Sequence, residues 1–228
     1  MPKNKIHKVL SYLFPNFTCL VCGCELRYQT DCEHICHECF ANIKHADQPI
    51  NNAKVVLKLE QDTVKLRKVI APFTYNKEIS KPILLLKYGN DGLTAEAFAP
   101  FMQRNINITD YDIIIPIPLS KSRQRQRGYN QAQVIADYVI KEKTPPFRKD
   151  ILFKTKKTTP QENMTTKERL ENQKDAYVIK EENAVKNLRI LLIDDVITSG
   201  ATTNEAASIL IKHGAKYVDI LAIARVEK

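Results

Sequence analysis

Hydrophobic and polar positions follow two alternating patterns along most of the chain after residue 64. Short apolar runs rich in β-branched side chains indicate buried strands, and apolar residues that recur every three or four positions indicate helices. These patterns predict strands over residues 64–75, 111–117, 151–153, 189–193 and 217–225. They predict helices over residues 79–106 with a break near 89–92, over 130–143, and over 202–213, where Gly214 ends the helix. Strands that alternate with helices predict an α/β fold, with a mostly parallel sheet flanked by helices.

Two segments lie outside this alternation. Residues 1–17 carry a single apolar stripe of helical spacing, which predicts a short amphipathic docking helix rather than a signal peptide. Residues 154–174 are polar and charged without periodicity, which predicts a long mobile loop of the kind that forms an active-site lid. A disordered insertion is the alternative to the lid. No apolar run is long enough to span a bilayer, and we expect a cytoplasmic protein.

All six cysteines lie between Cys19 and Cys39, which sets an N-terminal module apart from the rest of the chain. Four of them form two C-x-x-C pairs, and these four are Cys19, Cys22, Cys36 and Cys39. Two such pairs predict a tetrahedral structural Zn²⁺ site with no open position for catalysis. Disulfides are the alternative, and the remaining Cys24 and Cys32 leave a ligand exchange open. We expect an amphipathic helix and zinc ribbon over residues 1–50 and a second domain over residues 51–228.

The segment from residue 190 to residue 202 combines a buried strand, two carboxylates and a small hydroxyl-rich turn that leads into a helix. The turn consists of Thr198, Ser199, Gly200, Ala201 and Thr202. Its backbone N–H groups and hydroxyls, at a helix N-terminus, form an anion cradle. Asp194 and Asp195 would repel a bare phosphate, but carboxylates accept hydrogen bonds from ribose hydroxyls and hold Mg²⁺. The segment therefore predicts a ligand with a 5′-phosphate, a ribose diol and a magnesium-bound pyrophosphate.

Competing interpretations of this segment fit less well. It contains neither G-x-x-x-x-G-K-[ST] nor G-x-G-x-x-G, which excludes a P-loop and a dinucleotide fingerprint. A buried strand followed by an N-capped helix is the purely structural alternative, and it leaves the adjacent aspartates unexplained.

The formal net charge of +9 is concentrated in one region. Residues 120–174 hold 14 Lys or Arg against 6 Asp or Glu, a balance of +8, which implies an anionic partner such as phosphate, nucleic acid or an acidic membrane surface. A solvated basic surface is the alternative.

A basic loop is expected directly after the buried strand that ends near residue 117. Its cations Lys121, Arg123 and Arg127 are placed to stabilise a leaving pyrophosphate. We assign Ser120 and Arg123 as ligand-binding residues. We assign Lys121 as a catalytic residue, together with Arg169, which we expect to close over the ligand on the predicted lid. Lys87 ends the helical segment that starts near residue 79, and we favour a surface lysine there over the alternative that it approaches the ligand.

The segment 190–202 resembles the signature of type I phosphoribosyltransferases. The wider combination of the four-cysteine ribbon, the sequence RGYNQA at 127–132, Thr159-x-Gln161, Glu168-Arg169 and Asn172 resembles the competence protein F family. The resemblance implies a type I phosphoribosyltransferase fold behind a zinc ribbon. It also implies that Asp194 and Asp195 face the ribose hydroxyls and Mg²⁺, and that residues 198–202 hold the 5′-phosphate of phosphoribosyl pyrophosphate.

The same resemblance implies a role in natural transformation, with incoming single-stranded DNA and a translocation helicase as partners. The basic stretch is a candidate for contacts to the DNA backbone, and Phe17, Tyr28 and Phe40 of the ribbon are candidates for stacking on bases. Two other functions stay open. One is a phosphoribosyltransferase of nucleotide salvage that acts on an unidentified base, and the other is a zinc-ribbon adaptor with a vestigial site. The sequence predicts no oligomeric state.

Overall fold

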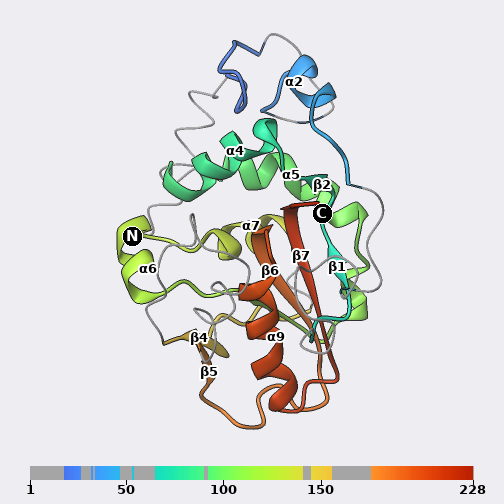
Figure 1. Cartoon of the computed structure of the whole chain (residues 1–228), viewed down its shortest axis with the longest axis vertical. Coiled ribbons are helices and arrows are strands. Elements are labelled where there is room, and N and C mark those ends of the chain that lie inside the picture. The colour runs from blue at the N-terminus through green and yellow to red at the C-terminus, as the bar shows by residue number, and fades with distance from the viewer. Residues whose placement is uncertain are drawn as a thin grey trace.

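The computed structural model describes residues 18–26, 32, 34–46, 53, 65–89, 92–140, 145–155 and 176–227. Its centre is a five-stranded sheet in which all paired strands run parallel. The long strands β6 (Arg189–Ile197) and β7 (Tyr217–Arg225) lie in the middle (Figure 1). On one side β3 (Ile113–Pro116) pairs with β6, and on the other β1 (Val69–Ile70) and β2 (Phe73–Thr74) pair with β7. The predicted parallel sheet is confirmed.

The strand expected over residues 64–75 is interrupted. Val69 is in register with Ile220 and Phe73 with Ala224, so β1 and β2 follow the same edge of β7. Pro72 lies between them, and proline has no backbone N–H to donate to a sheet. The prediction of one continuous strand is therefore wrong, although its pairing direction fits the parallel sheet.

Helices cover both faces of the sheet. One hydrophobic cluster joins β6 and β7 to α4 (Lys77–Tyr88), α5 (Leu93–Arg104) and α7 (Gln131–Val139), and a second joins the same strands to α9 (Ala201–Lys212). Leu191 belongs to the first cluster and Leu192 to the second, because successive side chains of a strand point to opposite faces. Burial on both faces explains the apolar run over residues 190–193 of β6. The predicted break between α4 and α5 is confirmed.

Shorter elements precede and follow β3 or form a separate strand pair. The helix α6 (Lys121–Arg127) follows β3, and the 3-10 helix η2 (Ile108–Asp110) precedes it. The strands β4 (Leu152–Lys154) and β5 (Tyr177–Ile179) form a small antiparallel pair. These strands flank residues 156–175, which lie outside the described residues. The predicted lid, with Arg169, falls largely in that gap.

The cysteine-rich segment packs directly on the helical layer. Ile35 and Ile43 belong to the same hydrophobic cluster as Phe98 of α5. The rings of Phe40 and Phe101 have centroids 5.4 Å apart. Figure 1 shows α2 (His37–Ala41) beyond α4 and α5, at the end of the molecule away from α9. The ribbon and the α/β layers therefore share one core, and a domain boundary at residue 50 stays a prediction.

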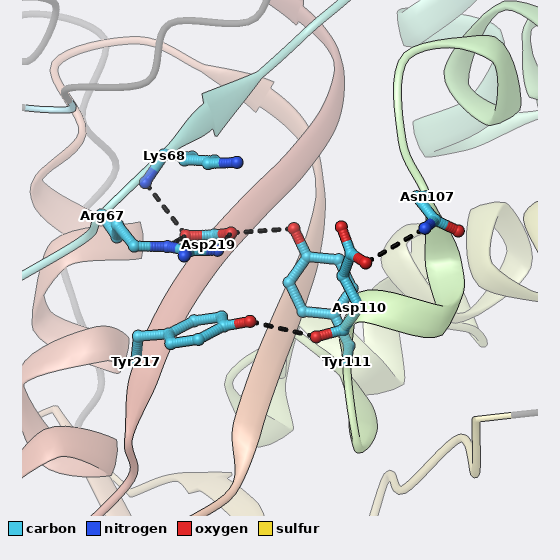
Figure 2. A network of polar contacts seen from close by, with 7 residues as sticks. All are labelled: Arg67, Lys68, Asn107, Asp110, Tyr111, Tyr217 and Asp219. Atoms are coloured by element: carbon cyan, nitrogen blue, oxygen red, sulfur yellow. Dashed lines mark hydrogen bonds and ion pairs between the residues drawn. The ribbon is translucent and has the colours of Figure 1, made fainter.

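At the amino-terminal half of β7, a buried polar network ties the sheet edge to the segment before β3. Asp219 is fully buried, and its carboxylate accepts hydrogen bonds from the side chains of Arg67 and Tyr111 (Figure 2). This network lies away from the carboxyl ends of the strands, where the pocket described below opens.

Two expectations concern the chain as a whole. The amphipathic helix expected over residues 1–17 lies outside the described part of the chain. Within the described residues, none of the helices combines the length and the apolar character that a membrane crossing requires.

Candidate functional site

A pocket of about 730 Å³ opens at the carboxyl ends of β3 and β6. Its walls come from α4, α6, the start of α7, the β4–β5 pair, and the turn between β6 and α9. In parallel α/β sheets, ligands bind at this end of the strands. Among the described residues, four cations and two carboxylates line the pocket. They are Lys87, Arg123, Arg127, Lys154, Asp194 and Asp195. The pocket is therefore suited to an anionic ligand that also carries groups for carboxylates to bind.

The acidic pair lies within a strand rather than after one. The strand β6 continues to Ile197, so the prediction that it ends at residue 193 is wrong. Both carboxylates line the pocket, and each accepts a hydrogen bond from the next backbone N–H, at 2.9 Å for Asp194 and 2.7 Å for Asp195. Burial, and then the neighbouring Asp195 carboxylate, raise the pKa of Asp194 to about 8. A cation at this position would relieve both effects.

Lys87 is part of the site, and its interpretation as a surface lysine is wrong. Its Nζ lies 3.1 Å from Oδ2 of Asp195, and the side chains are 26% and 12% exposed. Burial lowers the pKa of Lys87, but the charge and hydrogen bond of Asp195 outweigh burial and raise it overall. The ammonium group is therefore held as a cation against the acidic pair.

The turn after β6 contributes only part of its predicted residues to the pocket wall. Thr198, Gly200 and Thr202 line the pocket. Ser199 is buried behind the turn, where its Oγ accepts a 3.4 Å hydrogen bond from the backbone N–H of Ala201. Gly200 is the N-cap residue of α9, with φ of 80°, a conformation that glycine adopts without strain. Because glycine has no side chain to cap the helix, the first-turn N–H groups after Ala201 donate no hydrogen bond to a side chain of the N-cap residue and can bind a ligand.

The basic stretch forms the helix α6, and the expectation of a loop is wrong. Ser120 caps α6 by accepting a hydrogen bond from the backbone N–H of Arg123, and Gly128 ends it in the left-handed conformation. Ser120, Arg123 and Arg127 line the pocket. Lys121 is exposed and, in the part of the chain that the structure describes, lies outside the pocket lining.

Several lining residues carried no functional assignment from the sequence. Lys154, at the end of β4, faces the pocket, and burial followed by the charge of Arg123 lowers its pKa to about 8. Gln131 is 2% exposed, and its Nε2 has no hydrogen-bond partner among the described residues. The position of Lys154 after a predicted strand was a usable signal. Nothing in the sequence distinguished Gln131 from a core residue of α7.

Apolar side chains gather at the same pocket. Tyr75, Leu84 and Tyr88 line it and remain 37%, 51% and 63% exposed. The guanidinium of Arg127 lies 5.2 Å from the ring centroid of Tyr88. Exposed apolar side chains beside a polar pocket mark a surface for a flat or apolar part of a ligand.

The four cysteines of the two C-x-x-C pairs converge. The Sγ atoms of Cys19, Cys22, Cys36 and Cys39 all lie within 4.8 Å of one another. Backbone N–H groups of Val21 and Cys36 donate to the Sγ of Cys19, at 3.4 and 3.3 Å. Amide donors directed at sulfur stabilise thiolates, and a tetrahedral Zn²⁺ site needs sulfurs about 3.8 Å apart. The cluster fits such an ion.

The two other cysteines have different surroundings. The Cys32 thiol is buried and donates to the carbonyl oxygen of Ala97 at 3.4 Å. The exposed Cys24 thiol lies beside the cluster, and hydrogen bonding with Cys22 raises its pKa to about 12. Cys32 therefore belongs to the contact with α5, and Cys24 borders the four-cysteine cluster.

Comparisons with known proteins agree with this architecture. Residues 117–228 match the family described as phosphoribosyl transferase domain. Competence protein F of Haemophilus influenzae is 35% identical over 100 residues, which cover 43% of this chain and 44% of that protein. DNA utilization protein YhgH of Salmonella typhimurium is 22% identical over 214 residues, which cover 91% of this chain and 89% of that protein. The first match thus spans less than half of its relative.

Among solved structures, an allosteric regulatory enzyme of purine biosynthesis has a TM-score of 0.39 and 15% identity, covering 61% of this chain and 30% of that chain. A likeness this distant carries no functional information. The domain match and the parallel sheet confirm the predicted phosphoribosyltransferase fold. The chain thus has a four-cysteine cluster ahead of a phosphoribosyl transferase domain, and it is similar to competence protein F and DNA utilization protein YhgH.

Proposed function

We propose that the pocket binds phosphoribosyl pyrophosphate together with Mg²⁺. One observation carries the proposal: the acidic pair, the hydroxyl-bearing turn and the cations of α4, α6 and β4 line one cavity. Asp194 and Asp195 supply oxygen ligands for Mg²⁺ or acceptors for ribose hydroxyls. Thr198, Thr202 and the N-terminus of α9 suit the 5′-phosphate.

The remaining cations suit the pyrophosphate. Arg123 and Arg127 can bind two phosphate oxygens each through their planar guanidinium groups. Bound Mg²⁺ would neutralise charge that develops on a leaving pyrophosphate. Arg123 and Lys154 would hold the same charge through fixed contacts in a partly buried site, where electrostatic interactions are stronger than in water. Arg169 and Lys121 remain proposed catalytic residues. We expect Arg169 to reach the ligand when the predicted lid closes, and Lys121 to stabilise the leaving pyrophosphate.

Calorimetric titration with phosphoribosyl pyrophosphate and Mg²⁺ tests this proposal. The wild type, Asp194→Ala, Asp195→Ala and the exposed control Asp150→Ala should be compared. Binding should fall at least about tenfold in the first two variants, since each loses a charge-assisted contact, and should be unchanged in the control. Equal binding in all four proteins would favour an adaptor with a vestigial site.

We propose that the four-cysteine cluster holds a structural Zn²⁺ ion. Four thiolates complete a tetrahedral shell, so the ion would stabilise the ribbon and leave no position for a substrate. Metal analysis of protein purified without chelator should give about one zinc per chain. A disulfide-bonded, metal-free ribbon would contradict the proposal.

We propose that the protein handles incoming single-stranded DNA during natural transformation, in the cytoplasm and beside a translocation helicase. The names of its relatives support a role in competence or DNA utilization. The exposed Lys121 and Arg125 on α6 supply cations outside the pocket wall. DNA affinity should then fall steeply with salt, and Arg125→Ala should weaken DNA binding without changing phosphoribosyl pyrophosphate binding. A flat salt titration would contradict this part of the proposal.

A salvage phosphoribosyltransferase is the second candidate function. The exposed wall of Tyr75, Leu84 and Tyr88 favours it, because a planar base could stack there beside the phosphoribosyl group. Pyrophosphate release on addition of a common nucleobase would support salvage. If Tyr88→Ala releases pyrophosphate as fast as the wild type, the base does not bind on this wall.

A further inference from the structure

Lys87 is held at the pocket by the packing of α4. The helix buries Ile79, Ile83 and Leu86 in the core and turns the face of Leu84, Lys87 and Tyr88 to the pocket. Residues three and four positions apart share a helix face, which accounts for this division. The core packing thus fixes which side chains α4 offers to the ligand.

Two further contacts fix the end of α4 beside Lys87. The hydroxyl of Tyr129, which follows α6, donates to the backbone carbonyl of Leu86. The backbone N–H of Gly89, the C-cap residue of α4, donates to the carbonyl oxygen of Leu85 at 2.7 Å. The backbone that carries Lys87 is therefore tied both to the core and to the segment after the basic helix.

The charges around Lys87 are uneven. Asp195 bonds it directly, Asp194 attracts it from the same strand, and Arg127 repels it from α6. In the absence of other ions, the ammonium group is the cation in contact with the acidic pair within the described pocket. It therefore occupies the electrostatic position that a divalent cation would take.

We propose that Lys87 is the resident counter-cation of Asp194 and Asp195, and that it keeps free Mg²⁺ out of the site until a phosphoribosyl ligand arrives. This inference rests on the proposed function of the pocket. A divalent cation that enters alone must displace Lys87 from Asp195 and then remain beside it, so two like charges meet in a partly buried space. Mg²⁺ that enters with a polyphosphate brings the negative charge that Lys87 needs as its new partner.

Lys87 would then act as a specificity-determining residue. It makes binding of the metal depend on binding of the phosphate ligand, since the metal competes with the ammonium group for the carboxylates, and the phosphates of the ligand compensate the charge of the displaced ammonium group. Linkage requires that such coupling is reciprocal: the ligand strengthens metal binding as much as the metal strengthens ligand binding. Removing the ammonium group should weaken that coupling and, at the same time, improve the binding of the metal alone.

The test compares wild type, Lys87→Met and the control Lys81→Met, in which an exposed lysine of the same helix is removed. The first measurement titrates Mn²⁺ alone, as a spin-active stand-in for Mg²⁺, into the full chain. The second titrates phosphoribosyl pyrophosphate in saturating Mg²⁺. We expect Lys87→Met to bind Mn²⁺ alone about tenfold more tightly and the phosphoribosyl ligand about tenfold more weakly, the scale of one partly buried ion pair. Lys81→Met should match the wild type in both measurements.

Unchanged or weaker Mn²⁺ binding by Lys87→Met would overturn the inference. Failure of the wild type to bind phosphoribosyl pyrophosphate would instead contradict the proposed function. The Mn²⁺ comparison would still decide whether Lys87 keeps free divalent cations away from the acidic pair. If Lys87→Met unfolds on purification, Lys87→Gln and thermal melting replace the titration. Added Mg²⁺ should then raise the melting temperature of Lys87→Gln more than that of wild type, and an equal rise would overturn the inference.

Discussion

Arg67 donates two hydrogen bonds to the buried carboxylate of Asp219, from Nε at 3.0 Å and from Nη2 at 2.6 Å (Figure 2). The same carboxylate accepts the hydroxyl of Tyr111 at 2.8 Å and the backbone N–H of Lys68 at 3.1 Å. The guanidinium also lies 3.5 Å from the ring centroid of Tyr217. One buried anion thus connects the start of β1, the start of β3 and β7.

Replacing this anion should cost stability without affecting the pocket. Asp219→Asn leaves a neutral acceptor against Arg67, and we expect a loss of about 2–3 kcal/mol, reduced from the value for fully buried pairs because Arg67 is half exposed. Urea unfolding measures it. Asp112→Asn is the control, since Asp112 and Arg189 are 33% and 36% exposed, and should cost less than about 1 kcal/mol. Equal losses of unfolding free energy in the two variants would show that the burial of Asp219 does not determine the size of the loss.

A second prediction follows from the Nε2 atom of Gln131, for which the described residues provide no hydrogen-bond partner. A buried donor without a partner costs free energy, and a ligand oxygen in the pocket would satisfy it. Gln131→Met should therefore stabilise the free protein by about 1 kcal/mol and weaken phosphoribosyl pyrophosphate binding about tenfold. Thermal melting with and without ligand gives both values. A variant that is less stable when free, with unchanged affinity, would mean that the amide is already satisfied by water.

The acidic pair and the cysteine pairs could be predicted because each is a local pattern. Two aspartates after four apolar residues, and two C-x-x-C pairs, are visible within a few positions of sequence. The end of β6 was misplaced because charges usually stop a buried strand. Val196 and Ile197 continue it past Asp195, since β-branched residues favour the extended conformation.

Lys87 and the helix α6 could not be predicted in the same way. Lys87 occupies a polar position of an amphipathic helix, and only the fold brings Asp195 to it. In α6 no apolar residue marks a helical period, so the apolar pattern gives no signal. Its signals were Ser120 as N-cap and Gly128 as the left-handed residue after the end.

The lowered pKa of Lys154 predicts that the stability of the protein depends on pH. Burial, and then Arg123, lower its pKa from 10.5 to about 8, although Asp194 opposes the shift. Between these values the unfolded chain binds a proton that the folded chain does not, so the contribution of Lys154 to stability rises as pH increases. At neutral pH the buried ammonium group costs free energy.

Lys154→Met should therefore be more stable than wild type at pH 7, by about 2 kcal/mol, and the difference should shrink towards zero as the pH rises through 8 to 10. Chemical denaturation of both proteins across this range gives the difference directly. The exposed control Lys149→Met should differ from wild type by a constant small amount. A constant large difference for Lys154→Met would mean that the packing of the new side chain, and not the charge, is responsible.

The last prediction concerns the ribbon, and it separates the proposed zinc ion from the pocket. Phe40 and His45 pack on Phe101 and Phe73, so loss of the ribbon structure would uncover an aromatic patch. Cys22→Ser should lose zinc, lower the melting temperature by several degrees and bind a hydrophobic dye, because the ion organises a segment too small to fold alone. Cys24→Ser, at the thiol that borders the cluster, should keep both the zinc and the melting temperature.

Phosphoribosyl pyrophosphate binding should survive in both variants, since the described residues that line the pocket come from residue 75 onward. Loss of that binding in Cys22→Ser but not in Cys24→Ser would mean that the ribbon also holds α4 and α5 in place through their shared core. Zinc loss from Cys24→Ser would contradict the assignment of the four ligands and make Cys24 one of them.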